Sequence, residues 1–298
     1  LMLLILSGVL TTLFLLLKEH LLMWFGASDA TFGYANTYLT IYTAGTFFAL
    51  MATGMNSFLI AQGFSGLGMA TVMLGAVLNI ILDPVFIFLL DLGVKGAAIA
   101  TVLSQALSGL ACLAFMVRRF PILRMQGAEK RFDLHSAKVL CWMGIPMGLQ
   151  YSITAVGSII LQSAVNGLGT AAIASVAAGA KLFQLICCPY DAMGSSMATY
   201  CGQNVGACKL DRLGQGMRAC AWLGLGYAVL AVGAMLLFAP QCAMLFLNQD
   251  EADLARLVSL TSQYITTLTA FFFPLALVNI VRFSIQGMGF SQLAILAG

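Results

Sequence analysis

Apolar residues follow one another in long, nearly unbroken runs. The runs of 20 residues or more lie at about residues 1–25, 34–62, 69–90, 94–117, 139–166, 171–200, 213–247 and 255–287, and a further run begins before Gly298. At 1.5 Å per residue, a helix of about 20 residues crosses a hydrocarbon core about 30 Å thick. The pattern predicts an all-α membrane protein, a polytopic helical bundle with eight full transmembrane helices.

The composition agrees with this pattern. The 298 residues are 61% hydrophobic and 8% charged, whereas a soluble domain has about 45–50% apolar residues. A soluble protein of this size would have too few polar residues to cover its surface. The lipid bilayer is therefore the expected partner of the apolar faces.

The charged residues lie mostly between the runs, and their signs alternate. Basic residues concentrate after the fourth and the sixth run, whereas acids such as Asp91 and Glu251 follow the third and the seventh. Lys and Arg near short loops mark the cytoplasm, so both basic loops are expected there. The first of them, residues 118–138, is predicted to be a cytoplasmic linker between an N-lobe at 1–117 and a C-lobe at 139–298.

The two lobes are expected to be copies of one architecture. A shift of 226 residues lays 34–67 over 260–293, and the run GFSxL ends both segments. Extending the match predicts two pseudo-symmetric six-helix lobes, both incomplete here and related by an axis along the membrane normal. Because the chain begins at Leu1 inside an apolar run, we expect a fragment that lacks two helices at each end.

An acid stands inside the third run, in LNIILDPVFIF. A carboxylate at the middle of a membrane helix costs about 2.5–3.5 kcal/mol, so Asp83 is expected to face a cavity or a partner. Asn79 lies one turn earlier on the same face. In a hairpin that turns near residue 92, Thr101 lies level with Asp83, and Gln105 lies level with Asn79. We expect these four side chains to form a cation site, with Na⁺ at Asp83, Asn79 and Thr101 or a proton shared with the acid.

Prolines accompany several of these positions. Pro84 removes a backbone donor and frees a carbonyl one turn back, so a hinge is expected there. The alternative is that Asp83 caps a restarted half-helix with Pro84 at its first position. Pro146 and Pro189 are further expected hinges, and Pro274 is expected to kink the eighth run.

Polar residues also lie within the runs of the C-lobe. Lys181 and Asp191 are ten residues apart, about 15 Å along a helix, which is too far for a direct pair. They either face the substrate cavity, where Asp191 would attract cations, or are satisfied locally, with Lys181 snorkelling and Asp191 bonded to nearby hydroxyls. Gln150 and Gln162 are either substrate ligands or, with Asn166, hydrogen-bond partners of other helices.

No motif for enzyme chemistry accompanies these features. The chain shows no nucleophile–base pair, and the glycines of GFSGLG at residues 63–68 follow a membrane helix rather than a strand, which argues against a nucleotide loop. We expect no enzyme activity, no cofactor other than a coupling ion and no nucleic acid partner.

Several segments together resemble a known family. LNIILDPVFIF, GVKGAAIATVLSQALSG, MGIPMGLQ and MATYCGQNVGA are similar to the multidrug and toxin extrusion (MATE) family of secondary transporters. The resemblance implies twelve helices in two lobes, of which this chain carries about helices three to ten. It also implies export of bulky organic, often cationic, compounds in exchange for Na⁺ or H⁺. We expect a monomer in the bacterial cytoplasmic membrane.

The resemblance extends to the site residues. Family members with an N-lobe cation site use an Asp and an Asn four apart on the fifth helix and a Thr on the sixth, which match Asp83, Asn79 and Thr101, together with an Asp on the first helix. Other members place acids at positions that correspond here to about Thr154 and Leu275, neither of which is acidic. Coupling through the N-lobe is therefore expected.

Two other functions remain as alternatives. A lipid-linked saccharide flippase shares the lobed architecture, but flippases line their cavity with several basic residues, and Lys181 is the one basic residue expected deep in a run. The second alternative is a truncated transporter without activity.

Overall fold

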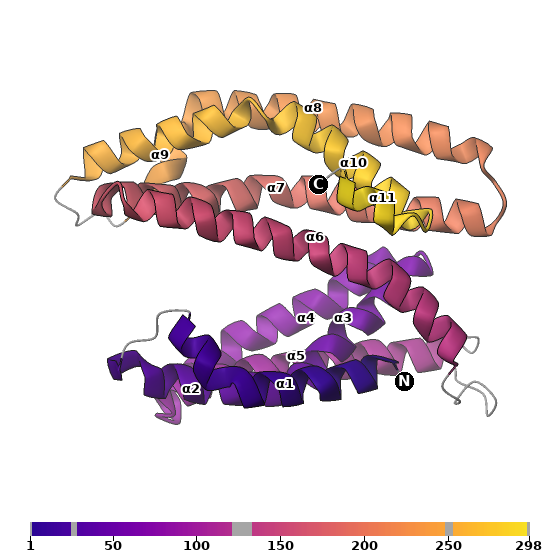
Figure 1. The fold of residues 1–298 in the computed structure, drawn as a ribbon, viewed down its shortest axis with the longest axis horizontal. Coiled ribbons are helices and arrows are strands. Elements are labelled where there is room, and N and C mark those ends of the chain that lie inside the picture. Colours follow the sequence, from indigo (N-terminus) through magenta and orange to yellow (C-terminus); the bar gives the residue numbers. More distant parts are fainter. Residues whose placement is uncertain (1, 25–28, 121–132, 248–252, 297–298) are drawn as a thin grey trace. The chain divides into compact units, whose positions relative to one another are not determined.

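The computed structural model describes residues 2–24, 29–120, 133–247 and 253–296. Within these ranges the chain forms helices joined by short turns, without any strand (Figure 1). The chain divides into two compact units, Leu1–Ala137 and Lys138–Gly298, called unit 1 and unit 2 below. Most of the expected linker at 118–138 lies outside the described residues.

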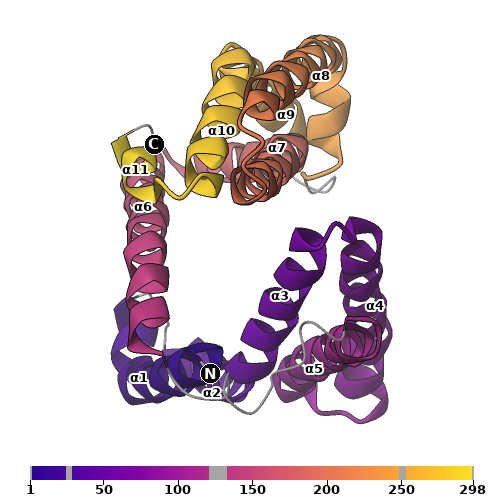
Figure 2. The same ribbon diagram turned by 90° about the vertical axis from the view of Figure 1, so that its right-hand side faces the viewer.

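Unit 1 is built around α5. Its elements are α1 (Met2–Trp24), α2 (Asp29–Ala44), α3 (Thr46–Ala61), α4 (Ser65–Pro84), the π-helix η1 (Val85–Leu89) and α5 (Gly93–Arg119). Helices α2, α3 and α4 all pack on α5 (Figure 2). Small residues allow this, because a Cβ added to Gly96 would lie 2.6 Å from the carbonyl oxygen of Phe86, and Ala98 is fully buried. The backbones of η1 and α5 therefore approach each other closely.

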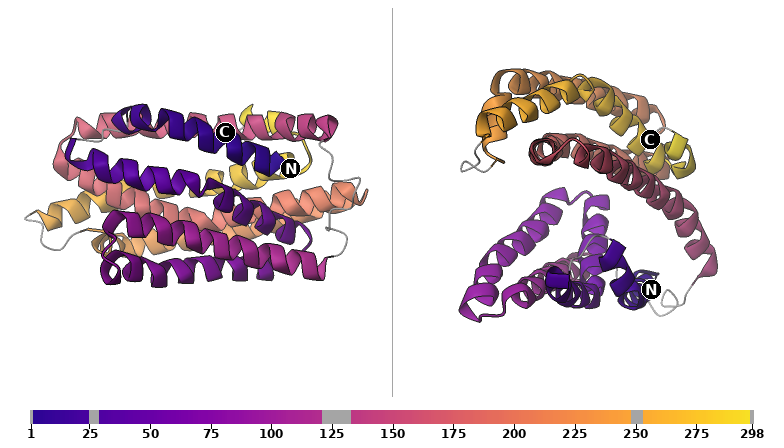
Figure 3. Two further views of the ribbon diagram at one scale, coloured as in Figure 1. Left: turned by 90° about the horizontal axis from the view of Figure 1, so that it is seen from below. Right: turned by 60° about the vertical axis from the view of Figure 1, so that its left-hand side comes forward.

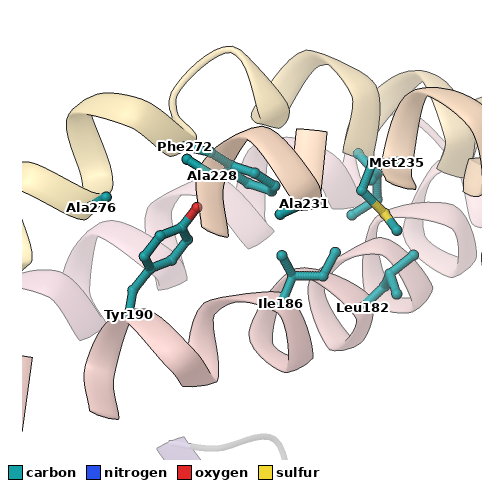
Figure 4. Packing of buried hydrophobic residues seen from close by; sticks show 9 residues of the cluster. Leu182, Ile186, Tyr190, Ala228, Ala231, Met235, Phe272 and Ala276 are labelled. Atoms are coloured by element: carbon teal, nitrogen blue, oxygen red, sulfur yellow. The ribbon is translucent and has the colours of Figure 1, made fainter. Parts of the chain in front are cut away.

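Unit 2 holds the remaining helices. They are α6 (Leu134–Asn166), whose first turn belongs to unit 1, α7 (Thr170–Gly206), α8 (Asp211–Met244), α9 (Leu254–Thr269), α10 (Phe272–Gly287) and α11 (Ser291–Leu296). Helices α7, α8, α9 and α10 pack into a bundle. Its core is apolar and aromatic, with Tyr190 of α7 and Phe272 of α10 pointing toward Ala228 of α8 (Figure 4). This core fixes the position of α10 against α7.

Helix α6 begins with an acidic cap. The carboxylate of Asp133 accepts hydrogen bonds from the backbone N–H groups of His135 at 3.1 Å and Ser136 at 3.0 Å. The Ser136 hydroxyl also bonds to it, and these contacts hold the pKa of Asp133 below its usual range. An acid at this position satisfies donors that the first turn leaves free. Further along, α6 is exposed from Tyr151 to Ala164.

The predicted number of membrane spans is confirmed by helix length and composition. Among the described residues, six helices are long and apolar enough to cross a membrane, and the number rises to eight if each of two bent helix pairs counts as one span. The bent pairs are α2 with α3, at 49°, and α9 with α10, at 53° (Figure 3). The second run was expected to form one helix, which is wrong, because its helix breaks at Gly45.

The two bends confirm the internal repeat. Helices α3 and α10 each contain 16 residues, and their first and last residues are related by the shift of 226 found in the sequence. A glycine with positive φ follows each helix, Gly63 at 87° and Gly289 at 95°. Such a φ is readily adopted only without a side chain. The repeated GFSxL run thus begins with the residue that turns the chain.

Candidate functional site

A cavity of about 500 Å³ lies in unit 1 between α3, α4 and α5. Three of the four residues expected at a cation site, Asn79, Thr101 and Gln105, lie on its wall. The fourth, Asp83, is half-buried and does not line the cavity. It is connected to the wall through Asn79, whose Nδ2 donates a hydrogen bond to Asp83 Oδ1 at 3.2 Å. The structure therefore brings the four expected residues together. Asp83 does not line the cavity and is linked to it through Asn79.

The cavity wall offers mainly hydrogen-bond acceptors. The hydroxyls of Thr101 and Ser104 donate their protons to backbone carbonyls one turn earlier, at 2.9 Å and 2.7 Å, so their lone pairs remain available to a ligand. Gln105 Oε1 is buried and has no hydrogen-bond partner among the described residues. None of the lining residues is basic. Oxygen atoms without a nearby positive charge are suited to binding a hard cation.

Helix α3 supplies polar wall residues that sequence reasoning missed. Thr53, Asn56 and Ser57 line the cavity from this side, and Asn56 Nδ2 donates to the carbonyl of Gly68 at 2.8 Å. Their spacing of three and four residues places them on one helix face. That spacing was the available signal, but it does not identify the helix that faces them.

Pro84 marks a change of helix type. Helix α4 ends at Pro84 and passes directly into the π-helix η1. Asp83 does not cap a restarted helix, because η1 has no side-chain cap and the Asp83 carboxylate is bonded one turn back, to Asn79. π-Helical turns are rare and occur frequently at functional sites. Pro146 and Pro189 lie inside the uninterrupted helices α6 and α7, and their role as hinges stays a prediction.

In unit 2, Lys181 and Asp191 are both exposed on α7. Asp191 Oδ1 accepts a hydrogen bond from Asn279 Nδ2 of α10 at 3.5 Å, so its partner is a distant amide and not a local hydroxyl. Asn279 Oδ1 in turn accepts a hydrogen bond from Arg282 Nη2 at 2.8 Å. Asp191 is therefore linked to a basic residue of α10 through one side-chain amide.

A further basic residue of unit 2, Arg282, was not considered in the sequence analysis. It lies in the second half of α10, five residues before the helix ends at Gly287, and is half-buried. The sequence signal was present, since Arg282 is one of two charged residues in the run 255–287, and the other, Arg256, lies at its start. What the sequence does not show is the contact of Asn279 with Asp191 of α7, because these two residues lie 88 positions apart.

The two predicted glutamines of α6 differ in their surroundings. Gln150 is buried, and its Oε1 accepts a hydrogen bond from Gln286 Nε2 of α10 at 3.2 Å. Gln162 is exposed, and its Nε2 donates to Asn166 Oδ1 within α6 at 2.9 Å. Gln150 is thus the interhelical partner that was expected, whereas Gln162 and Asn166 bond to each other. Substrate contacts of either glutamine stay a prediction.

Comparison with known proteins agrees with this architecture. The family model described as MatE matches residues 1–85 and 146–297. Probable multidrug resistance protein YpnP of Bacillus subtilis (strain 168) is 29% identical over 269 residues, which cover 89% of this chain and 58% of that protein. Multidrug export protein MepA of Staphylococcus saprophyticus is 27% identical over 181 residues, 61% of this chain and 40% of that protein.

The fold is also similar to solved structures. The outward-facing conformation of a multidrug resistance MATE family transporter of the MOP superfamily matches with a TM-score of 0.91 and 24% identity, over 99% of this chain and 65% of that one. The match shows that the helices follow the same path. The chain spans less than two thirds of the length of the proteins to which it is similar.

Proposed function

Because the chain belongs to the MatE family, whose members are secondary transporters and not enzymes, we propose that the protein is an antiporter. It exports small organic compounds across the plasma membrane in exchange for Na⁺ or H⁺, by alternating access. The names of YpnP and MepA, a multidrug resistance protein and a multidrug export protein, support the choice of cargo. The coupling ion binds in unit 1.

The observation that carries this proposal is the acceptor-rich cavity of unit 1 with Asp83 behind it. A cation in the cavity meets oxygen atoms of Thr101 and Gln105, and the Asp83 carboxylate lies one amide away through its bond to Asn79. In a medium of low dielectric constant, that negative charge attracts a cation strongly. The expected response is that Asp83 exchanges its bond with Asn79 for one with the ion.

Helix geometry provides a route from ion binding to movement. Asp83 is directly followed by Pro84 and by η1, in which the hydrogen-bond ladder is already widened by one residue. A shift of the Asp83 side chain therefore acts at a point where α4 resists bending least. When the ion leaves, the hydrogen bond between Asn79 and Asp83 would form again and α4 would regain its original course. This cycle couples ion occupancy to the shape of unit 1.

The test is Asp83→Asn in the full-length protein reconstituted into vesicles. Efflux of a fluorescent organic cation is followed under an imposed Na⁺ gradient and, separately, under a pH gradient. We expect exchange to fall to the level of empty vesicles under both gradients, while the midpoint of thermal unfolding stays close to that of the unmodified protein. Asp91→Asn is the matched control, because Asp91 is exposed at the end of the same hairpin. Unchanged exchange by the Asp83 variant would exclude the proposal.

The Thr101→Val variant distinguishes Na⁺ from H⁺ as the coupling ion. This change keeps the shape of the side chain and removes one oxygen from the wall. If Na⁺ is the coupling ion, its half-saturating concentration should rise about tenfold, which corresponds to about 1.4 kcal/mol. If H⁺ is the coupling ion, the pH dependence of transport should stay the same, since Asp83 still carries the proton.

A further inference from the structure

Arg282 lacks a counter-charge. The side chain is half-buried within α10. Its Nη2 donates a hydrogen bond to Asn279 Oδ1 at 2.8 Å, and its Cζ lies 4.9 Å from the centroid of the Phe283 ring. Arg282 Nε is buried and has no hydrogen-bond partner in the described part of the chain. No carboxylate of these residues forms an ion pair with the guanidinium.

This arrangement is costly for a membrane helix. A guanidinium stays protonated, so it cannot escape the cost of burial by losing its charge. The amide oxygen and the aromatic face each compensate part of that charge, but neither carries a full negative charge. The free Nε–H belongs to the donor fork with which a guanidinium binds a carboxylate or phosphate through two hydrogen bonds. Arg282 therefore has the charge for one anion, and its buried Nε–H becomes available to that anion when the half-buried side chain moves.

Asn279 keeps the neighbouring acid from supplying that anion. Its Nδ2 faces Asp191 and its Oδ1 faces Arg282. Because the amide lies between the two charged groups, Asp191 and Arg282 stay separated by one side chain and form no ion pair with each other. Asp191 is exposed on α7. The group thus presents an acid and a base to a molecule that approaches α7 and α10.

The internal repeat provides an independent observation. The shift of 226 residues lays Asn279 and Arg282 over Thr53 and Asn56 of α3, and both of these line the cavity of unit 1. The face of α3 that lines the cavity of unit 1 therefore corresponds to the face of α10 that carries the Arg282 guanidinium in unit 2. The neutral amide of Asn56 is replaced by a cation at the equivalent position, which reverses the charge preference of that face.

We propose that Arg282 binds an anionic group, a carboxylate or a phosphate, of the transported compound, while Asp191 binds an amine of the same molecule. The substrate class of the antiporter then includes zwitterions, because a bound zwitterion compensates both charges at once. Asn279 is a positioning residue that holds the two groups apart. This inference rests on the proposed function and deepens it by assigning a substrate class to unit 2.

The test uses two dyes that differ in one group, a rhodamine methyl ester, which is a cation, and the corresponding free acid, which is a zwitterion. Binding of each dye to the full-length protein in neutral-lipid nanodiscs is measured by fluorescence anisotropy, which does not require transport. Arg282→Gln should raise the Kd of the free acid at least about tenfold, as expected for loss of a charge-assisted pair. The Kd of the ester should change by less than about twofold.

Two further variants complete the comparison. Arg282→Lys keeps the charge but loses the fork, so its Kd for the free acid should lie between those of the unmodified protein and Arg282→Gln. Arg218→Gln removes an exposed basic residue of α8 and should change neither dye. Equal weakening of both dyes by Arg282→Gln, or no weakening of the free acid, overturns the inference.

Lipid phosphate is the other source of such an anion. If phosphatidylglycerol in the nanodiscs abolishes the Arg282-dependent preference for the free acid, the anion bound at Arg282 is a lipid headgroup and the substrate form of the inference is wrong. An unchanged preference supports a substrate anion. If both dyes bind as expected but vesicles show no ion-driven efflux, the antiport proposal fails while the binding site at Arg282 stands.

Discussion

The α2–α3 and α9–α10 pairs are two copies of one bent membrane span, and different residues bend them. In unit 1 the break is at Gly45, where an added Cβ would lie 2.3 Å from Cγ2 of Val102, so a side chain there requires Val102 to move. In unit 2 the matching residue is Phe271, and Pro274 lies one turn later. Proline has no N–H for the carbonyl of Ala270 and crowds it. The repeat thus retains the bend while its local cause differs.

The residues that follow the two bends in the chain differ as well. Phe272 begins α10 and is fully buried in the core of unit 2, whereas the corresponding residue of α3 is the half-buried Thr46. The polar faces also differ, since Thr53 and Asn56 line a cavity without basic residues and their counterparts include Arg282. One backbone geometry therefore supports a polar cavity without basic residues in unit 1 and, at the equivalent positions of unit 2, a helix face with a guanidinium.

Phe272→Ala should have the largest effect on this contrast. It empties a fully buried aromatic position in the core of unit 2 and should lower the free energy of unfolding by about 3–5 kcal/mol. Phe273→Ala, at a neighbour that is 38% exposed, should cost less than about 1 kcal/mol. The measurement is SDS-titrated unfolding followed by circular dichroism. Equal costs at the two positions would mean that the bend of unit 2 does not depend on this core.

Gly287→Ala should have the next largest effect. A Cβ there would lie 2.2 Å from the carbonyl oxygen of Ala198, and backbone atoms cannot move aside, so α10 must separate from α7 at a cost of about 1–3 kcal/mol. The matching residue of unit 1 is already alanine, Ala61. The reverse change, Ala61→Gly, should cost at most about 1 kcal/mol. The same unfolding titration compares them, and a tolerated Gly287→Ala would contradict the close approach of α7 and α10.

Gly45→Ala should have a smaller effect, about 1 kcal/mol, because the methyl group meets a side chain and alanine also favours the helix. Shortening that neighbour tests the cause directly. If Val102 is the obstacle, the double variant with Val102→Ala should lose less stability than the sum of the two single changes. Additive losses would show that Gly45 is required for some other reason.

Pro274→Ala should have the smallest effect on stability, within about 0.5 kcal/mol, since Pro274 lies in the first turn of α10, where its missing N–H costs little. Its effect should appear in geometry instead. Spin labels at exposed positions of α9 and α10 should report an angle below the present 53°, because Ala270 regains a donor. An unchanged angle would mean that packing around Phe272 alone sets the bend.

Much of the fold follows from local pattern. Each membrane run is visible as a stretch of apolar residues. The match of GFSxL at 63–67 and 289–293 indicates the repeat from the sequence alone. The Asn79–Asp83 contact was also predictable, because residues four apart on a helix always share a face. These features depend on residues that are close together along the chain, so they can be predicted from the order of the residues.

Other features depend on which helices meet. The cavity wall from α3 was missed because Thr53 and Asn56 have a clear spacing but no visible partner. The Asp191–Asn279–Arg282 group was missed because Asp191 lies 88 residues from Asn279, although Asn279 and Arg282 lie only 3 residues apart. Asp83 was expected on the wall of the cation site, whereas the structure sets it behind Asn79. Both residues share one face of α4, so helix spacing alone does not specify which of them reaches the cavity.

By itself the sequence determined the membrane class, the runs, the repeat and the residues with chemistry inside the bilayer, since each follows from composition or from spacing along one helix. Only the tertiary structure decided where the repeated spans bend, which oxygen atoms share a cavity, and that Arg282 forms no ion pair with a carboxylate of the described residues. The physical reason is that these depend on contacts between helices. Such contacts are set by small residues, kinks and side-chain rotamers acting together, and none of these leaves a periodic signal in one segment.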